Sequence, residues 1–104
     1  MALDEEIFRE ATEMIEANLY TTITTQMLAQ RLNVSTSTLF RSFQKYTSMG
    51  THRYIRRRKM EKATELLQQG CSVAQTAERL GFCTPGYFSL CYKRETGCYP
   101  SQIK

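Results

Sequence analysis

The chain has 104 residues, four cysteines and no tryptophan, and its formal net charge is +4 at neutral pH. This length allows one small domain, or two very small lobes on a shared linker, and leaves little room for a deep substrate pocket. No apolar run approaches the roughly 18 residues needed to span a bilayer, and the acidic start is unlike a signal peptide. We therefore expect a soluble cytoplasmic protein.

The charge is unevenly distributed along the chain. Residues 1–20 carry six acidic side chains and one basic one, whereas residues 21–104 carry four acidic and thirteen basic side chains. The longer part is thus strongly cationic, as the binding of nucleic-acid phosphates requires. An ordinary solvated surface would give the same composition.

Three helices are predicted in the first half of the chain. Apolar residues recur at three- and four-residue steps over 4–18, which indicates an amphipathic helix. Thr24 is a suitable cap for a second helix that ends near Leu32. A third helix begins at Ser35 or Thr36 and ends near residue 46.

The second half begins with a long predicted helix. Residues 51–69 contain neither glycine nor proline, and Gly70 follows them. Two shorter helices are expected over 73–80 and 84–96, and a final short turn over 100–104.

The basic run in the long helix does not form one stripe. Lys59 falls beside the apolar face, so we expect its stem to pack and its ammonium group to pair or reach solvent. Arg57 lies on the other side, where an ion pair with Glu61 is expected.

One short sequence occurs twice, about 48 residues apart. Residues 29–34 read AQRLNV, and residues 77–82 read AERLGF. Each copy predicts a short helix, a tight turn and a second capped helix, which is the helix-turn-helix unit that lays its second helix in a DNA major groove. Asn33 in one turn matches Gly81 in the other, and both residue types tolerate the left-handed conformation of such a corner.

A longer pattern of residues extends beyond these two copies. It comprises Leu28, Ala29, Leu32, Asn33, Val34, Ser35, Leu39, Arg41, Phe43, Tyr54, Ile55, Ala63, Leu66, Leu67, Val73, Ala77, Gly81, Phe82, Tyr87, Phe88, Tyr92, Lys93, Gly97, Pro100 and Ser101. This pattern resembles the DNA-binding domain of the AraC/XylS-type transcriptional regulators over essentially the whole chain. The length is similar to the stand-alone MarA/SoxS-like branch, and a domain cut from a longer regulator would look the same.

The resemblance implies an all-α fold of about seven helices. Two helix-turn-helix lobes, at 1–50 and 70–104, would be joined by the linker helix at 51–69. Both recognition helices, at about 35–46 and 84–96, would enter successive major grooves of double-stranded DNA as a monomer, which implies a sequence-specific transcriptional regulator. Successive grooves on one face lie about 34 Å apart, so closer helices would bend the DNA.

The resemblance also implies which side chains meet DNA. Base reading falls to Ser37, Phe40, Arg41 and Ser89. Backbone contacts fall to Thr24, Ser35, Thr36, Lys45, Arg57, Thr84, Tyr87, Lys93 and Arg94.

The two lobes differ in what they offer to the bases. Arg41 can donate two hydrogen bonds to guanine, and Phe40 either contacts a thymine methyl group or packs. Pro85, Gly86 and Leu90 offer few hydrogen-bonding groups in the second lobe. We therefore expect the first lobe to be the main reader and the second to be mainly a backbone anchor.

A protein-binding module that docks on another regulator or on RNA polymerase is the alternative. No nucleophile–histidine arrangement or phosphate loop supports an enzyme, and the four cysteines lack zinc-ligand spacing, so no cofactor or metal is expected. Cys91 falls on a core-facing position.

The target promoter, the direction of regulation and the inducing signal are not encoded in any motif.

Overall fold

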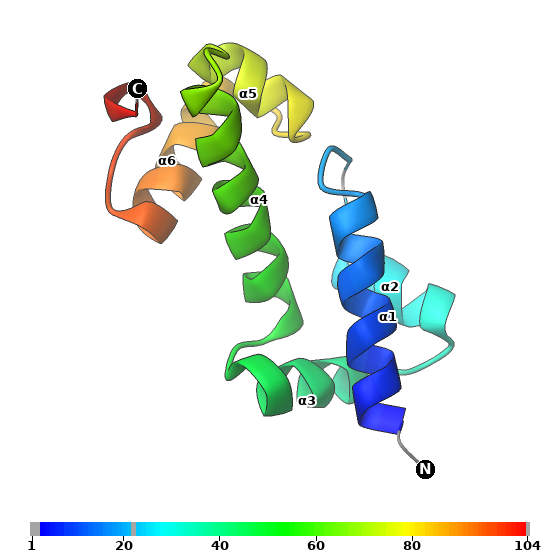
Figure 1. Cartoon of the computed structure of the whole chain (residues 1–104). Coiled ribbons are helices and arrows are strands. Elements are labelled where there is room, and N and C mark those ends of the chain that lie inside the picture. Colours follow the sequence, from blue (N-terminus) through cyan, green and yellow to red (C-terminus); the bar gives the residue numbers. More distant parts are fainter. Residues whose placement is uncertain (1–2, 22, 104) are drawn as a thin grey trace. The chain divides into compact units, whose positions relative to one another are not determined.

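The computed structural model describes residues 3–21 and 23–103. These residues form α1 (Leu3–Ala17), α2 (Thr25–Leu32), α3 (Thr36–Thr47), α4 (Thr51–Gln68), α5 (Val73–Arg79), α6 (Pro85–Thr96) and the short 3₁₀ helix η1 (Pro100–Gln102), without any strand (Figure 1). The predicted all-α fold is confirmed, and each predicted helix ends within one or two residues of the observed one. Lys104, the end of the predicted final turn, lies outside the described residues. No described helix is long and apolar enough to cross a membrane.

The described residues divide into two compact units. Residues 3–18 and 23–56 make up the first unit, and residues 19–21 and 57–103 make up the second. The turn after α1 therefore belongs to the second unit, and α4 contributes residues to both.

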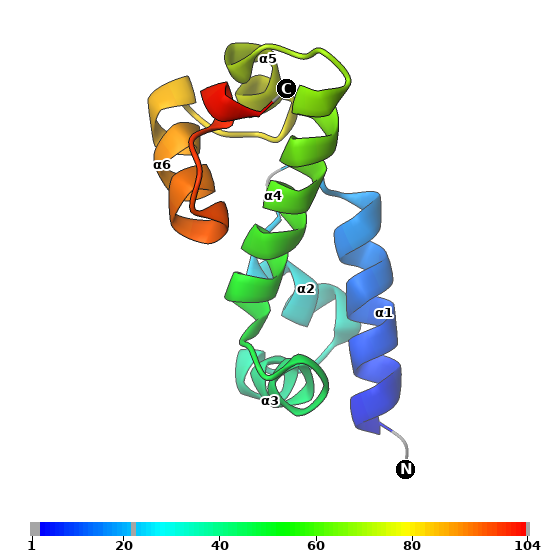
Figure 2. The same cartoon turned by 60° about the vertical axis from the view of Figure 1, so that its left-hand side comes forward.

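In the first unit, α1 packs against α2 and α3, as both views show (Figure 1 and Figure 2). The amphipathic pattern of α1 places Ala11 and Ile15 in a fully buried position against this pair. An aromatic cluster closes the same core, because the ring of Phe43 lies 5.1 Å from the rings of both Phe8 and Tyr54. Burial of these apolar side chains is what holds three short helices together.

The first helix-turn-helix has the predicted local geometry. Thr24 caps α2 by accepting a hydrogen bond from the backbone N–H of Met27, and Ser35 caps α3 by accepting one from Thr38. Asn33 stands between the helices with a φ of 57°, in the left-handed region. Asn tolerates this conformation better than most residues, which confirms the reason for its match with Gly81.

The second unit is built around α4, α5 and α6. Its buried side chains are Met60, Ala63, Leu66, Leu67, Ala77, Leu80, Phe88, Cys91 and Tyr92. In this core Phe88 and Tyr92 are fully buried, and Cys91 packs beside them as predicted. Phe82 is partly buried against this core.

The second helix-turn-helix repeats the first with a longer turn. The N-caps of α2 and α5, Thr24 and Ser72, are 48 residues apart, whereas the N-caps of α3 and α6, Ser35 and Thr84, are 49 apart. The extra residue lies in the turn around Gly81, whose φ is 81°. Beyond this turn, equivalent residues of the two units are offset by 49.

The ends of α3 and α6 confirm this offset. Ser48 and Gly97 are the respective C-caps, and both are left-handed, with φ values of 62° and 84°. The hydroxyl of Thr47 donates to the carbonyl of Phe43 at 2.7 Å, and that of Thr96 donates to the carbonyl of Tyr92 at 2.8 Å.

One buried cation organises the second unit. The ammonium group of Lys59 donates to the backbone carbonyls of Leu19, Thr21 and Leu80 at 3.1, 2.7 and 2.8 Å. Lysine has three N–H donors, so all of them are used. Burial lowers the pKa of Lys59 below its ordinary value, and the hydrogen bonds offset the cost of removing this charge from water. The ammonium group pairs with carbonyls and does not reach solvent.

Surface charges on α4 pair differently from the prediction. Glu61 accepts a hydrogen bond from Arg58 at 2.6 Å, whereas Arg57 was the expected partner. A spacing of three residues brings two side chains together on a helix as well as a spacing of four does.

We predict that Lys59→Met lowers the free energy of unfolding by about 2–4 kcal/mol, because three carbonyls lose their donors at once. Chemical denaturation of the two proteins measures this difference. Arg57→Met on the exposed side of the same helix is the control, and it should change stability by about 0.5 kcal/mol or less. Equal stability of wild type and Lys59→Met would contradict this role for the cation.

Candidate nucleic-acid interface

The outward face of α3 carries three of the predicted base-reading residues. Ser37, Phe40 and Arg41 are exposed, while Leu39 and Phe43 of the same helix are fully buried. Helical periodicity separates the two sets, since residues three or four apart share a face. The buried side chains fix the helix on its core and leave the exposed ones available to a partner.

Two of these exposed side chains have local contacts. Arg41 donates a long hydrogen bond of 3.4 Å to the hydroxyl of Thr38, which in turn accepts one from the Ser35 hydroxyl at 2.9 Å. The ring of Phe40 is 51% exposed, yet it lies against Gly50. A Cβ atom added at Gly50 would come within 2.6 Å of this ring, so the absence of a side chain there makes room for Phe40.

The outward face of α6 is different in character. Leu90 and Tyr87 are 59% and 52% exposed, and Gly86 beside them has no side chain. Ser89, the fourth residue predicted to read bases, is half-buried. This face therefore presents apolar and aromatic surface where α3 presents a guanidinium group.

Seven of the nine predicted backbone-contacting residues fall into two groups. Thr24, Ser35 and Thr84 hold helix N-termini, since each accepts a hydrogen bond from a backbone N–H in the first turn. Thr36, Arg57, Tyr87 and Arg94 are exposed side chains. Caps position the backbone amides of a helix N-terminus, which are groups that bind phosphate.

The two predicted lysine contacts are already engaged within the chain. Lys45 lies 3.7 Å from the carboxylate of Asp4, in an exposed pair of the kind that contributes little to stability. Lys93 donates to the carbonyl of Gly97 at 2.9 Å and lies over the ring of Tyr99. Each ammonium group has further N–H donors beyond these contacts.

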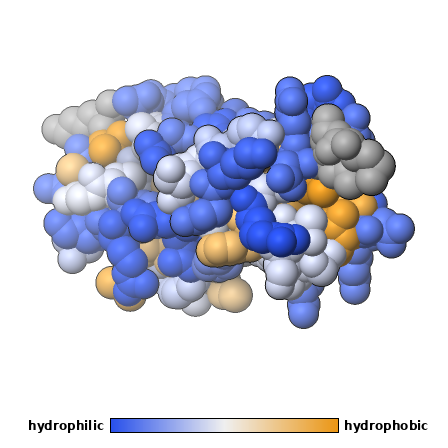
Figure 3. All heavy atoms as spheres, turned by 90° about the horizontal axis from the view of Figure 1, so that it is seen from below, coloured by the Kyte–Doolittle hydropathy of each residue, from blue (hydrophilic) through white to orange (hydrophobic). Residues whose placement is uncertain are grey.

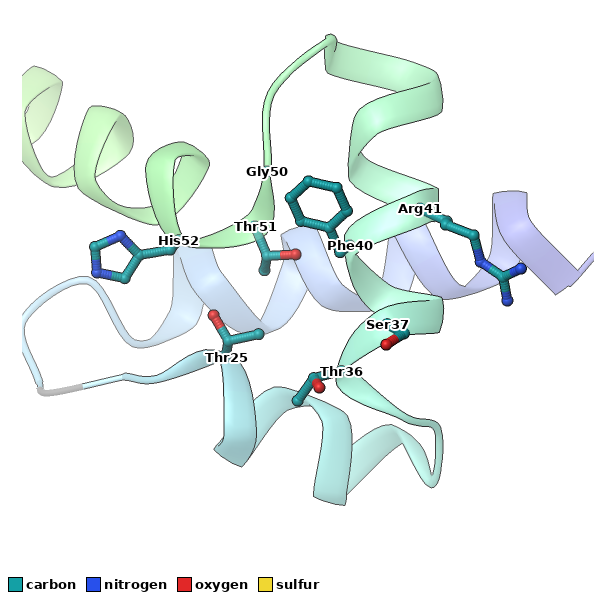
Figure 4. Close-up of a pocket in the computed structure, with 8 residues that line it drawn as sticks. All are labelled: Thr25, Thr36, Ser37, Phe40, Arg41, Gly50, Thr51 and His52. Carbon is teal, nitrogen blue, oxygen red and sulfur yellow. The ribbon is translucent and has the colours of Figure 1, made fainter.

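A pocket of about 410 Å³ opens beside the N-terminus of α3 (Figure 4). It is lined by Thr25, Thr36, Ser37, Phe40, Arg41, Gly50, Thr51 and His52. Sequence reasoning missed Thr25, Gly50, Thr51 and His52. A threonine at the first position of α2, α3 and α4 is the signal that could have pointed to them.

Thr51 is the unusual member of this group. Its side chain is 1% exposed, and its hydroxyl oxygen has no hydrogen-bond partner among the described residues. An unpaired buried hydroxyl lowers the stability of the fold, so its presence calls for a functional or structural explanation.

The surface has no large apolar area on the face that Figure 3 shows. That face is mostly hydrophilic, with separate hydrophobic patches between the polar side chains. Among the described residues, no group of three or more His, Cys, Asp or Glu side chains could hold a metal ion.

Comparison with known proteins decides the family. The profile of a helix-turn-helix domain matches residues 28–104. The transcriptional regulator GbdR of Pseudomonas aeruginosa is 36% identical over 93 residues, which cover 88% of this chain and 25% of GbdR. The C-terminal domain of AraT, a response regulator from Geobacillus stearothermophilus, has a TM-score of 0.87 at 31% identity, covering 93% of this chain and 82% of that one.

The chain belongs to the AraC-type helix-turn-helix family. The relatives and solved structures that it matches include bacterial transcriptional regulators and DNA-binding domains, in agreement with the sequence analysis. The DNA-binding domain of AdpA, solved in complex with a target DNA, has a TM-score of 0.81 at 25% identity and covers 90% of this AraC-type chain and 86% of its own. The chain spans a quarter or less of the length of the first curated relatives that it matches.

We predict that Thr51→Val raises the free energy of unfolding by about 1 kcal/mol. The substitution keeps the shape of the side chain and removes the unpaired buried hydroxyl. Thermal or urea denaturation measures the change. Thr76→Val is the matched control, because the buried hydroxyl of Thr76 donates to the carbonyl of Ser72 at 2.8 Å, and its loss should destabilise the fold. A loss of stability in Thr51→Val would mean that its hydroxyl has a partner.

Proposed function

We propose that this AraC-type domain is the sequence-specific DNA-binding part of a bacterial transcriptional regulator, with α3 and α6 each entering a major groove. The observation that carries the proposal is the outward face of α3, where Ser37, Phe40 and Arg41 project from a helix that is fixed by its buried side. A helix fits the major groove, where base edges differ in their hydrogen-bond patterns.

We assign most base reading to the first unit. Arg41 is permanently charged and can donate two parallel hydrogen bonds to the O6 and N7 atoms of guanine. Phe40 supplies apolar surface beside it, which suits a thymine methyl group. Ser37 can donate to or accept from either type of base pair.

We assign mainly backbone anchoring to the second unit. The exposed Arg94 and the lysine at 93 supply positive charge at the C-terminal part of α6, and Tyr87 offers a hydroxyl near its start. Thr84 holds the first turn of α6, whose backbone amides favour a phosphate. Such contacts fix the register on DNA but carry no base information.

The remaining predicted contacts with DNA would be made to its backbone phosphates. They are Thr24, Ser35, Thr36, Lys45 and Arg57. Because one chain carries two helix-turn-helix units, we infer that it binds DNA as a monomer; RNA polymerase is a further candidate partner.

The exposed Leu90 and Tyr87 favour one alternative, in which α6 docks on another protein. Salt distinguishes the two functions. The logarithm of a DNA-binding constant falls linearly with the logarithm of salt concentration because phosphate counterions are released. A protein-docking module would show no preference for a duplex even at low salt.

We predict that Arg41→Ala removes discrimination worth about 1–3 kcal/mol at one base pair of the preferred site. Selection from random duplexes would define the site, and binding to single-base variants would measure the loss. Arg9→Ala removes the same charge from α1 and should leave base preference unchanged. Unaltered preference in Arg41→Ala would refute base reading by this residue.

Lys93→Ala should weaken binding to all duplexes about equally and reduce the salt slope by about one. Anisotropy titrations of preferred and scrambled duplexes at several salt concentrations test this. Because Lys93 also donates to the Gly97 carbonyl, thermal denaturation must show that the variant is folded. A loss confined to the preferred sequence would assign base reading to the second unit instead.

A further inference from the structure

The pocket beside α3 is built from the beginnings of three helices. Thr25 is the first residue of α2, Thr36 and Ser37 are the first two of α3, and Thr51 and His52 are the first two of α4. The first backbone N–H groups of a helix have no partner within the helix and carry partial positive charge. Three helix N-termini around one pocket favour the binding of a negatively charged ligand.

The side chains lining the pocket have the same preference. Figure 4 shows the hydroxyl groups of Thr25 and Thr51 pointing into the space between the helices, while Arg41 and His52 extend outward on opposite sides. None of the eight described residues that line the pocket is acidic. The buried, unpartnered hydroxyl of Thr51 is a donor without an acceptor, and an anion entering the pocket would supply one.

The size and the apolar wall of the pocket indicate more than an inorganic ion. Its volume of about 410 Å³ lies within the range of small-molecule sites. The ring of Phe40 forms part of the lining and is 51% exposed, so it is available for stacking. A ligand with an acidic group on a flat apolar body would contact both the threonine hydroxyl groups of the pocket and the ring of Phe40.

The second unit provides an internal comparison. With the offsets of 48 and 49, the threonines at 25, 36 and 51 correspond to Val73, Pro85 and Pro100, and Arg41 corresponds to Leu90. The second unit keeps the same caps and the same left-handed corner without any of these polar groups. The helix-turn-helix geometry therefore does not need these polar groups, so their role is in binding and not in folding.

We propose that this pocket binds a small organic anion, a carboxylate or phosphate monoester on an aromatic body, at the place where the first unit reads DNA. The ligand shares Ser37, Phe40 and Arg41 with the base-reading face, so ligand and DNA compete. The competition, though not the binding of the ligand, rests on the proposed function.

Phenyl phosphate is a suitable probe, with benzyl alcohol and dimethyl phosphate as controls. Benzyl alcohol has the aromatic body without charge, and dimethyl phosphate has the charge of a DNA backbone phosphate without the body. In amide NMR titrations at constant ionic strength, phenyl phosphate should saturate and shift the amides of residues 25, 36 and 51. Both controls should bind at least tenfold more weakly.

Two variants test the contacts. Thr51→Val should weaken phenyl phosphate binding about tenfold, because a hydrogen bond to a charged group is lost. Phe40→Ala should weaken it about fivefold through loss of ring stacking. Ser89→Ala changes the equivalent of position 40 in the second unit and should leave binding unchanged.

Several results would overturn the proposal. They are no saturation at millimolar phenyl phosphate, equal binding of benzyl alcohol, equal binding of dimethyl phosphate, and full binding by folded Thr51→Val. Equal binding of dimethyl phosphate would identify the pocket as a binding site for a DNA backbone phosphate instead.

Competition is tested separately, on the duplex selected by the wild-type protein. The apparent dissociation constant for DNA should rise in proportion to phenyl phosphate in the wild type and much less in Thr51→Val. Simultaneous binding of probe and duplex would refute competition. DNA binding measured without probe and probe binding measured without DNA keep a failure of the proposed function distinct from a failure of this site.

Discussion

The second unit depends on the ammonium group of Lys59, which joins three separate segments of backbone. The turn after α1, the middle of α4 and the end of α5 meet at one nitrogen atom through the carbonyls of Leu19, Thr21 and Leu80. Lysine suits this position because its three donors diverge from a point, whereas the donors of arginine lie in a plane. Since Leu80 is the C-cap of α5, the cation also holds the end of that helix, after which the chain turns into α6.

The same local frame supports two different surfaces. In both units a hydroxyl residue caps the second helix of the helix-turn-helix (α3 or α6), a left-handed residue shapes the corner, and a second left-handed residue ends that helix. These features are backbone requirements, and they leave the outward side chains free to vary. Arg41 and Leu90 occupy equivalent places on the two helices, and they share no chemistry. A duplicated fold therefore need not mean a duplicated function.

The features that sequence could predict are the local ones. Thr24 is a cap as expected, and Ser35 and Thr84 cap the helices that were expected to begin near them, because capping involves residues only three positions apart. Contacts between distant residues escaped prediction. The carbonyl partners of Lys59 lie 40, 38 and 21 residues away, and no periodicity connects Thr25 to Thr51. The extra residue in the second turn was also hidden, since the two copies align without a gap up to that point.

The space left by Gly50 has a consequence for how such domains diverge. Gly50 lies outside the recognition helix, yet the resting place of the Phe40 ring depends on its missing side chain. A single change there, even to alanine, would push the ring across the exposed face of α3 without altering any residue of α3. Binding preference in this fold can thus evolve through a position outside the recognition helix, and alignments restricted to recognition helices would overlook it.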